Sequence, residues 1–143
     1  PYILMHMRGT PATMQQFTDY SEYGGVVPGV AAELHKAMAA LNLAGVRDVI
    51  IDPGFGFSKT APQNYELMRG LPELSALLGG LPALVGISRK SMIYKPLGLT
   101  PADALPGTTA LNPLALERGA AIIRVHDVAA AVQTRDVMQL FNL

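Results

Sequence analysis

The chain has 143 residues, half of them hydrophobic, and its formal net charge at pH 7 is zero. We therefore expect one soluble domain with a sizeable core, acting in a reducing cytoplasm. The charge balance argues against nucleic acid as a partner. The sequence contains no cysteine, which excludes thiol catalysis and disulfides. No apolar run is long enough to predict a membrane span.

Four short apolar runs predict strands that are buried on both faces. Each is rich in Val, Ile or Leu and is bounded by Gly, Pro or charged residues. Their ranges are 2–7, 48–51, 83–87 and 120–125. Because helical segments lie between them, the sequence predicts four βα units with parallel strands and right-handed crossovers.

The first helical segment is expected to open at Pro28, since proline suits the first turn of a helix. Gly45 stands just past its predicted end. Apolar residues recur between them at helical spacing, at Val30, Leu34, Ala37 and Leu41.

The later helical segments show clear start and stop signals. Thr60 is a cap candidate, and the segment that follows is broken at Gly70-Leu71-Pro72, which predicts two short helices. The segment after residue 100 also begins Thr-Pro; Pro113 lies inside it and should kink the helix or mark its restart. Asp127 can cap the last helix. That helix has Val137, Leu140 and Phe141 on one side.

Four βα units favour an α/β fold that is the C-terminal half of a (β/α)8 TIM barrel, since a complete barrel usually needs ~250 residues. A flavodoxin-like sheet is the alternative at this length. The sequence opens inside a strand-like run without an initiator Met. We therefore expect residues 1–143 to be a single domain that is truncated at its N-terminus.

Each predicted strand ends in residues that can bind a ligand. They are His6, Met7 and Arg8 after the first strand, Asp52 after the second, Ser88, Arg89 and Lys90 after the third, and Arg124, His126 and Asp127 after the fourth. The carboxyl ends of parallel strands share one edge in barrels and in open α/β sheets. Four such ends together indicate an active site in a shared crevice.

The loop from residue 52 to residue 59 has two interpretations. In the structural one, Asp52 closes an Asp-Pro-Gly turn, Phe55 and Phe57 belong to the core, and Lys59 is a solvated charge. In the functional one, Asp52 binds a ligand, one phenylalanine forms a wall for a flat ligand, and the glycines let the backbone approach it closely. We expect Lys59 to be solvated in both.

The last two strand ends also have two interpretations. The Ser-Arg-Lys-Ser cluster that begins at Ser88 can cap a helix, or it can bring N–H groups, a hydroxyl and a cation to an anion or a polar ring. Arg124 and His126 lie on one side of a strand. They form either a structural Arg–Asp pair with a core histidine or a phosphate or pyrophosphate site.

In the functional interpretation, the ligand has a planar polar part and an anionic part. Asp52 can accept two parallel N–H bonds from an aminopyrimidine edge. Arg124 and His126, with Lys90, would contact the anionic part. His35 has no partner at metal-ligand spacing and is expected on a helix surface.

Four stretches, LMHMRGTPATMQ, IIDPGFGFSKT, LVGISRKSMI and GAAIIRVHDV, together resemble the dihydropteroate synthase family. The resemblance runs from residue 2 to the C-terminus and covers strands five to eight of that family's barrel. It implies synthesis of 7,8-dihydropteroate from 6-hydroxymethyl-7,8-dihydropterin pyrophosphate and p-aminobenzoate, with release of pyrophosphate. It also implies Mg2+ as a cofactor, sulfonamides as competitors of p-aminobenzoate, and a homodimer.

The resemblance further implies a role for individual residues. Asp52, Lys90, Met5 and Gly56 would contact the pterin, Phe57 and Ser88 would border p-aminobenzoate, and Arg124 and His126 would hold the pyrophosphate. The family's Mg2+-binding Asn and its two mobile loops belong to the first four strands, which have no counterpart in this sequence. We therefore expect no metal ligand among these residues and no activity from them alone.

Two alternatives stay open. Methyltetrahydrofolate-binding methyltransferases share the fold and the strand-end Asp, although the motifs at 88–90 and 124–126 favour chemistry that releases pyrophosphate. The other alternative is a non-catalytic half barrel that acts as a binding or assembly module.

Overall fold

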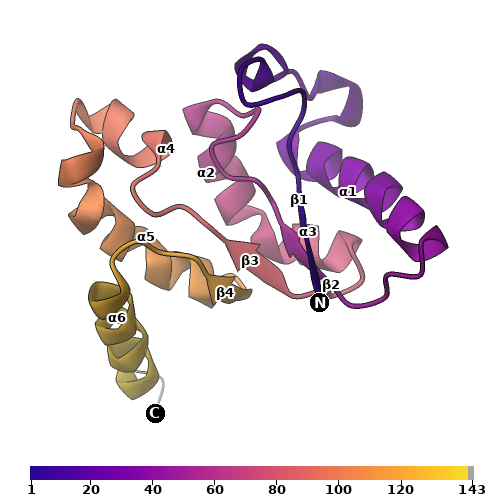
Figure 1. The fold of residues 1–143 in the computed structure, drawn as a ribbon. Helices are drawn as coiled ribbons and strands as arrows, with labels where there is room; N and C mark the ends of the chain where they lie inside the picture. Colours follow the sequence, from indigo (N-terminus) through magenta and orange to yellow (C-terminus); the bar gives the residue numbers. More distant parts are fainter. Residues whose placement is uncertain (142–143) are drawn as a thin grey trace.

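The computed structural model describes residues 1–141, in which strands and helices alternate (Figure 1). The strands are β1 (Tyr2–Met5), β2 (Val49–Asp52), β3 (Ala83–Val85) and β4 (Ala120–Ile123). The α-helices are α1 (Val26–Leu43), α2 (Ala61–Arg69), α3 (Leu71–Leu77), α4 (Ser91–Tyr94), α5 (Leu105–Glu117) and α6 (Val128–Phe141). Short 3-10 helices are η1 (Met14–Gln16), η2 (Ser21–Tyr23), η3 (Lys95–Leu97) and η4 (Pro101–Ala104).

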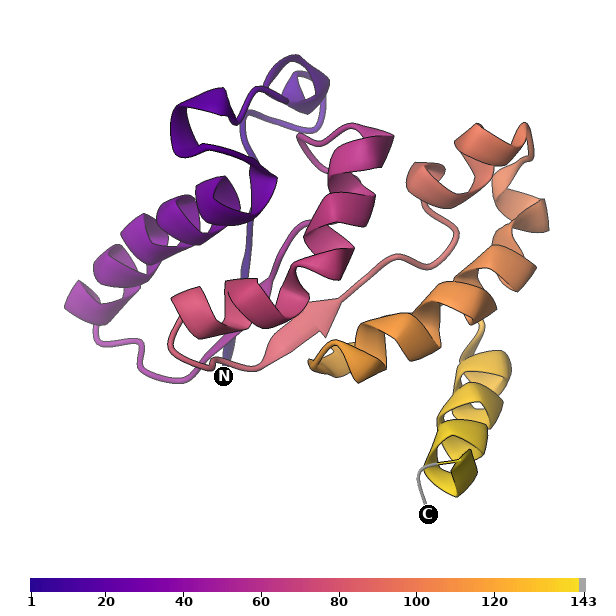
Figure 2. The same ribbon diagram turned by 180° about the vertical axis from the view of Figure 1, so that it is seen from behind.

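The strands form one parallel sheet in the order β1-β2-β3-β4, which confirms the predicted α/β arrangement. A flavodoxin-like sheet reverses its strand order and carries helices on both faces. Here the order is sequential, and α1, α2, α3 and α5 lie in front of the strands when the molecule is seen from behind (Figure 2). Sequential order with helices on one face is the winding of a barrel. The fold is therefore half of a (β/α)8 barrel, as predicted.

The hydrophobic core lies between the sheet and these helices. Ile51 and Val85 enter it from the sheet, Leu34 from α1, and Leu67 and Leu74 from α2 and α3. Burial of one such side chain contributes roughly 1.5–3 kcal/mol to folding. The core explains why the strands are apolar on the side that faces the helices.

The other face of the sheet is also apolar but is open. Ile3 of β1 is 50% exposed and Ile122 of β4 is 39% exposed. A closed barrel fills its interior with side chains of this kind. Within residues 1–141, no helix combines the length and the hydropathy that crossing a bilayer requires.

The sequence correctly predicted the break between α2 and α3. Thr60 and Gln63 form a capping box, in which each side chain accepts a hydrogen bond from the other residue's backbone N–H. This satisfies two N–H groups that the first turn of α2 leaves without helical partners. Gly70 then separates the two helices.

One helix boundary differs from the prediction. Helix α1 begins at Val26 rather than at Pro28. Proline is tolerated throughout the first turn, where N–H groups have no helical acceptor, so its position does not fix the first residue. Helix α5 is continuous through Pro113, without a restart. Burial of Ala115 and other residues of α5 against the core offsets the lost backbone hydrogen bond.

Candidate active site at the strand ends

All four strands contribute residues to one edge of the sheet. Met5 pairs with Asp52 where β1 and β2 end. Gly86 and Arg124 lie beyond the paired ends of β3 and β4. Lys90 follows β3, and the charges of Asp52 and Arg124 both act on its ammonium group. The structure therefore brings a carboxylate and two cations from three different strand ends into electrostatic reach of one another.

Asp52 is 6% exposed and closes the turn that follows β2. Its Oδ1 accepts a hydrogen bond of 2.8 Å from the backbone N–H of Gly54. Within residues 1–141 this is the one hydrogen bond that the carboxylate accepts. Because a carboxylate has about four acceptor positions, Asp52 can stabilise the turn and still bind a ligand. The structural and functional interpretations are thus compatible.

Glycine serves different purposes at the two loop positions. Gly54 has φ +70°, and a Cβ atom there would lie 1.9 Å from the backbone oxygen of His6. The absence of a side chain at Gly54 therefore lets the loop backbone lie against the end of β1, and it does not serve to admit a ligand. Gly56 has φ +81° and donates its N–H to Asn64 Oδ1 at 2.6 Å. A Cβ at Gly56 would come within 3.2 Å of Lys90 Cδ, so glycine leaves room for the lysine stem.

The two phenylalanines of the loop have separate environments. Phe55 is fully buried in the core. Phe57 is half-buried, and its ring centroid lies 4.5 Å from Lys90 Nζ, a cation–π contact. Lys90 also donates a hydrogen bond to the Phe55 carbonyl. Burial lowers the pKa of Lys90 to about 8, although the charge of Asp52 opposes this shift.

The prediction that Lys59 is a solvated charge is wrong. Lys59 is 3% exposed, and its Nζ donates to the carbonyls of Gly54 and Phe57 at 3.1 and 3.0 Å. It also lies 3.0 Å from His6 Nδ1. Both carbonyls lie outside any helix or strand. The Gly54 carbonyl also accepts the backbone N–H of Phe57 at 3.1 Å, and the lysine turns inward and supplies a further donor to each carbonyl.

Arg89 has a structural role. It donates hydrogen bonds of 2.8 Å to both carboxylate oxygens of Asp127. Its Nη1 donates to the carbonyls of Pro101 and Ala102 in η4. The fourth strand end suggested an Arg–Asp pair as one alternative, and such a pair does form, but Arg89 and not Arg124 is the arginine. It connects the loops after β3 and β4.

His126 is exposed, which rules out the core histidine of the structural alternative. The Oγ of buried Ser88 lies 2.9 Å from His126 Nδ1 and accepts the His126 backbone N–H at 3.1 Å. These contacts fix the Nδ1 side of the ring and leave Nε2 on its free edge. The contact of Ser88 with p-aminobenzoate that the resemblance implies stays a prediction.

Arg124 is exposed, and its guanidinium lies over Gly86. A Cβ atom at Gly86 would come within 3.0 Å of Arg124 Nη2. Within residues 1–141, Arg124 forms no ion pair. A guanidinium that is not neutralised suits an anion with several oxygens.

The remaining histidines do not form a metal site. His6 is buried, and its Nε2 lies 2.9 Å from Glu33 Oε2. His35 is exposed on α1, as predicted, with its Nε2 2.7 Å from the Leu77 carbonyl. Among residues 1–141, no three His, Cys, Asp or Glu side chains are grouped so that they could hold a metal ion. The described residues alone therefore do not fit a bound Mg2+.

Sequence reasoning missed three residues that shape this edge. Asn64 holds the loop through Gly56 and through the carbonyls of Lys59 and Thr60. An amide in the first turn of a helix directly after a glycine-rich loop was a usable signal for it. Gly86 was recognisable as a small residue two positions before the Ser-Arg-Lys motif. Glu33, on the distant α1, had no local signal.

Two hollows bear on where the site lies. One of about 480 Å3 adjoins the loop, with Gly56, Asn64 and Ser91 in its wall. Another of about 490 Å3 lies between α5 and α6, with Thr109 and Met138 in its wall. The second hollow is far from the strand ends and contains no cationic side chain. We place the site at the strand ends because the unneutralised cations and the buried carboxylate are there.

Comparisons with known proteins identify relatives of this chain. The family model described as pterin binding enzyme matches residues 1–126. A dihydropteroate synthase of Synechocystis sp. is 47% identical over 140 residues, which are 93% of this chain and 45% of that protein. The chain spans about half the length of the curated relatives it matches.

Solved structures show the same fold. A dihydropteroate synthase of Thermus thermophilus, in complex with 6HMPPP, gives a TM-score of 0.89 at 38% identity and covers 99% of this chain and 55% of that chain. The Thermus enzyme has also been solved with 4-aminobenzoate. A Yersinia pestis dihydropteroate synthase, in a sulfonamide drug complex, gives a TM-score of 0.90 at 35% identity and covers 99% of this chain and 51% of that chain.

Proposed function

Since the chain belongs to the family of pterin-binding enzymes, we propose that it is the later half of the barrel of a dihydropteroate synthase. This transferase of folate biosynthesis joins 6-hydroxymethyl-7,8-dihydropterin pyrophosphate to p-aminobenzoate and releases pyrophosphate. One observation carries the proposal: Asp52, Lys90 and the unneutralised Arg124 share one edge of the sheet. That is the arrangement needed for a ligand with a polar ring at one end and a diphosphate at the other.

The pterin occupies the Asp52 end of the site. The carboxylate accepts N–H bonds from the aminopyrimidine edge. Its Oδ1 already accepts one hydrogen bond from Gly54, whereas Oδ2 is fully available to the ligand. Lys90 approaches the ring from the next strand end. Met5, paired with Asp52 in the sheet, lies beside it, and Gly56 lets the ring approach the loop backbone.

The diphosphate occupies the Arg124 end. The reaction needs no protein nucleophile, because the aniline nitrogen of p-aminobenzoate attacks the pterin methylene as pyrophosphate leaves. Positive charge then develops on the methylene and negative charge on the leaving group. Arg124 and His126 stabilise the leaving pyrophosphate; Gly86 leaves room for the Arg124 guanidinium, and Ser88 orients His126 before the reaction. Orientation of the two substrates provides the other part of the rate enhancement.

We place p-aminobenzoate beside Phe57, whose half-buried ring offers an apolar face to a flat ligand, with Ser88 at the border. Sulfonamides would compete there. Support comes from the relatives in complex with 4-aminobenzoate and with a sulfonamide drug.

Three further elements complete the proposal for an enzyme with a whole barrel. They are Mg2+ as a cofactor, a homodimeric state and a cytoplasmic location. Because residues 1–141 contain no grouped metal ligands, Mg2+ would depend on donors outside them, and these residues supply no step through it.

The test is the affinity for a pterin in the full-length protein that carries this sequence. Asp52→Asn replaces an acceptor pair with a mixed donor and acceptor, so a charge-assisted hydrogen bond of ~1.5–3 kcal/mol is lost. We expect pterin affinity to fall by roughly one to two orders of magnitude in calorimetry. Asp48→Asn, at an exposed position before β2, is the matched control and should bind normally. Unchanged affinity of Asp52→Asn would remove Asp52 from the site.

A further inference from the structure

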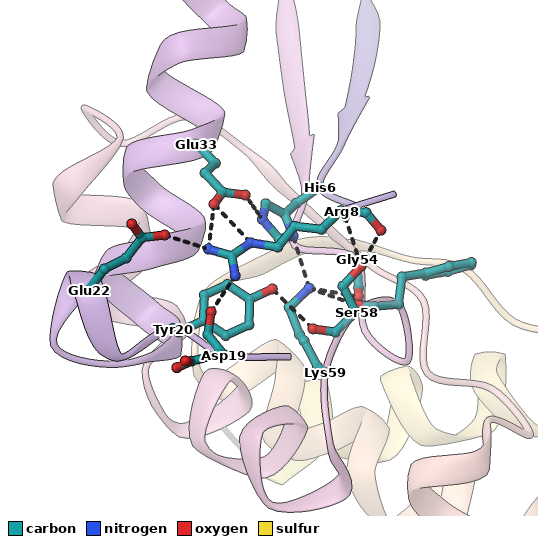
Figure 3. A network of polar contacts seen from close by, with 10 residues as sticks. His6, Arg8, Asp19, Tyr20, Glu22, Glu33, Gly54, Ser58 and Lys59 are labelled. Carbon is teal, nitrogen blue, oxygen red and sulfur yellow. Dashed lines mark hydrogen bonds and ion pairs between the residues drawn. The ribbon is translucent and has the colours of Figure 1, made fainter. Parts of the chain in front are cut away.

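A buried chain of polar contacts lies behind the loop that follows β2 (Figure 3). Glu33 of α1 binds His6 Nε2, and Lys59 Nζ lies at the Nδ1 edge of the same imidazole. Lys59 also donates to the carbonyls of Gly54 and Phe57. A helix on the outer side of the sheet is thereby connected to the loop that follows Asp52.

The proton positions in this chain follow from counting donors and acceptors. Arg8 donates to Glu33 Oε1 at 2.9 Å through its Nε. Burial opposes ionisation of Glu33, but the hydrogen bonds from Arg8 and His6 outweigh it and lower the pKa of the carboxyl. The ionised carboxylate is a pure acceptor, so His6 Nε2 carries the proton and His6 Nδ1 accepts from Lys59.

Three acceptors therefore converge on the Lys59 nitrogen: His6 Nδ1 and the carbonyls of Gly54 and Phe57. A protonated lysine has three N–H donors and satisfies all of them. A neutral amine has two N–H donors and one lone pair, so one of the three acceptors loses its bond to Lys59 and faces a lone pair. The Gly54 carbonyl keeps the backbone N–H of Phe57, so loss of a single proton weakens the link from the loop to His6 by one of its three hydrogen bonds.

We propose that Lys59 is a positioning residue whose protonated form ties the loop at Gly54–Phe57 to His6, and through His6 to Glu33, so that the loop is preformed for the pterin. Lys59 acts through the loop and does not contact the reacting atoms. This inference rests on the proposed function for its ligand, but not for the structural link between lysine and loop.

The charges around Lys59 bring its titration close to neutral pH. Burial lowers the pKa of Lys59 to about 7. The carboxylates of Asp52 on β2 and Glu33 on α1 oppose the shift, whereas the cations Lys90 and Arg8 add to it. His6 is neutral in this range, because burial and the charge of Lys59 lower its pKa to about 4. Lys59 is therefore mostly protonated, with three donors, at pH 6, and mostly neutral, with two donors, at pH 8.

The decisive variant is Lys59→Met in the full-length protein that carries this sequence. Methionine retains an unbranched apolar stem of similar length but has no donor. We expect the affinity for a pterin without a diphosphate to fall about tenfold at pH 6. The ratio of wild-type to variant affinity should be smaller at pH 8 than at pH 6, because wild-type Lys59 is then mostly neutral and has two donors instead of three. Titration of Lys90 occurs in both proteins and cancels from the ratio.

The matched control is Lys36→Met, at an exposed position on α1, which should bind the pterin like wild type at both pH values. A ratio for Lys59→Met that is large but the same at pH 6 and pH 8 would show that the protonation of Lys59 does not hold the loop. A ratio near one at pH 6 would show that the loop does not need it. Either result overturns the proposal.

Hydrogen exchange provides a readout that does not depend on any ligand. At pH 6, backbone amides at 54–58 should exchange faster in Lys59→Met than in wild type, with α3 unchanged. If the variant does not fold, wild type alone suffices: after correction for intrinsic rates, protection at 54–58 should fall between pH 6 and pH 8 relative to α3. Unchanged protection at 54–58 between pH 6 and pH 8 would refute the proposal that protonated Lys59 holds the loop. Normal exchange behaviour without any pterin binding would instead refute the proposed function.

Discussion

Arg89 and Asp127 form a two-pronged ion pair that connects the loop after β3 to the loop after β4, with both hydrogen bonds at 2.8 Å. Arg89 precedes Lys90, and Asp127 follows His126. Each structural residue is therefore adjacent in sequence to a candidate ligand-binding residue. The pair holds together the two loops that carry Lys90 and His126.

Arg89→Lys should destabilise the full-length protein, because a lysine cannot reproduce the planar fork that binds both oxygens of Asp127. We expect a loss of about 1–2 kcal/mol in urea unfolding, since part of the charge-assisted bonding is lost in a partly buried pair. Arg135→Lys, which alters the exposed pair with Asp136 on α6, should cost about 0–1 kcal/mol. Equal losses would mean that the Arg89 fork has no special role.

Gly54→Ala tests the contact between the loop and β1. Gly54 and Gly79 both have φ +70°, but a Cβ at Gly54 would meet the His6 backbone oxygen at 1.9 Å, whereas a Cβ at Gly79 would meet nothing within 4 Å. Gly79→Ala should therefore cost only the backbone strain of about 1–2 kcal/mol. Gly54→Ala should cost several kcal/mol more or prevent folding. Thermal unfolding of both variants compares them, and similar losses would argue against the close approach.

Arg124→Ala should weaken binding of the pterin pyrophosphate far more than binding of a pterin that lacks the diphosphate. In the proposed function the guanidinium would contact only the anionic end, and a hydrogen bond to a charged group contributes ~1.5–3 kcal/mol. Arg135→Ala removes an exposed arginine elsewhere and should change neither affinity. Calorimetry with both ligands measures the difference. Equal losses for the two ligands in Arg124→Ala would assign Arg124 a structural role.

Acid should destabilise the fold through His6. Burial, assisted by the charge of Lys59, lowers the pKa of His6 from 6.5 to about 4. Between these values the unfolded state binds more protons than the folded state, so stability falls as pH decreases from about 6.5 to about 4. The contribution is at most about 3 kcal/mol. His6→Gln, which does not titrate, should show a shallower decline in urea unfolding over this window, and an identical decline would refute the assignment.

Residues 1–143 alone should not form dihydropteroate. The open face exposes Ile3 and Ile122, and β1 and β4 present unpaired strand edges within the described residues. Such a piece should self-associate, bind the complementary half of a barrel, or aggregate. Sedimentation and an assay with p-aminobenzoate and Mg2+ check this. A monodisperse monomer with the turnover of a full-length enzyme would contradict it, whereas a stable inactive assembly would favour the half-barrel binding module.

The sequence by itself determined the repeating βα units and the edge of the sheet at which the candidate ligand-binding residues lie. Alternating apolar runs and helix caps are local signals, so four parallel strands and the break at Gly70 were predictable. Asp52, Lys90 and Arg124 could be predicted as candidate ligand-binding residues, because they follow strands or end them and parallel strands place their carboxyl ends at one edge of the sheet.

Only the tertiary structure decided which charged residues are partners. Lys59 and Arg89 stand in the same motifs as the candidate ligand-binding residues, and nothing local distinguishes them. Their roles depend on acceptors far along the chain: His6 for Lys59, and Asp127 for Arg89. A buried cation is stable only where the fold supplies such acceptors. Because that supply depends on how distant loops pack together, the sequence pattern could predict a charge at these positions but not whether it faces solvent, a ligand or the protein itself.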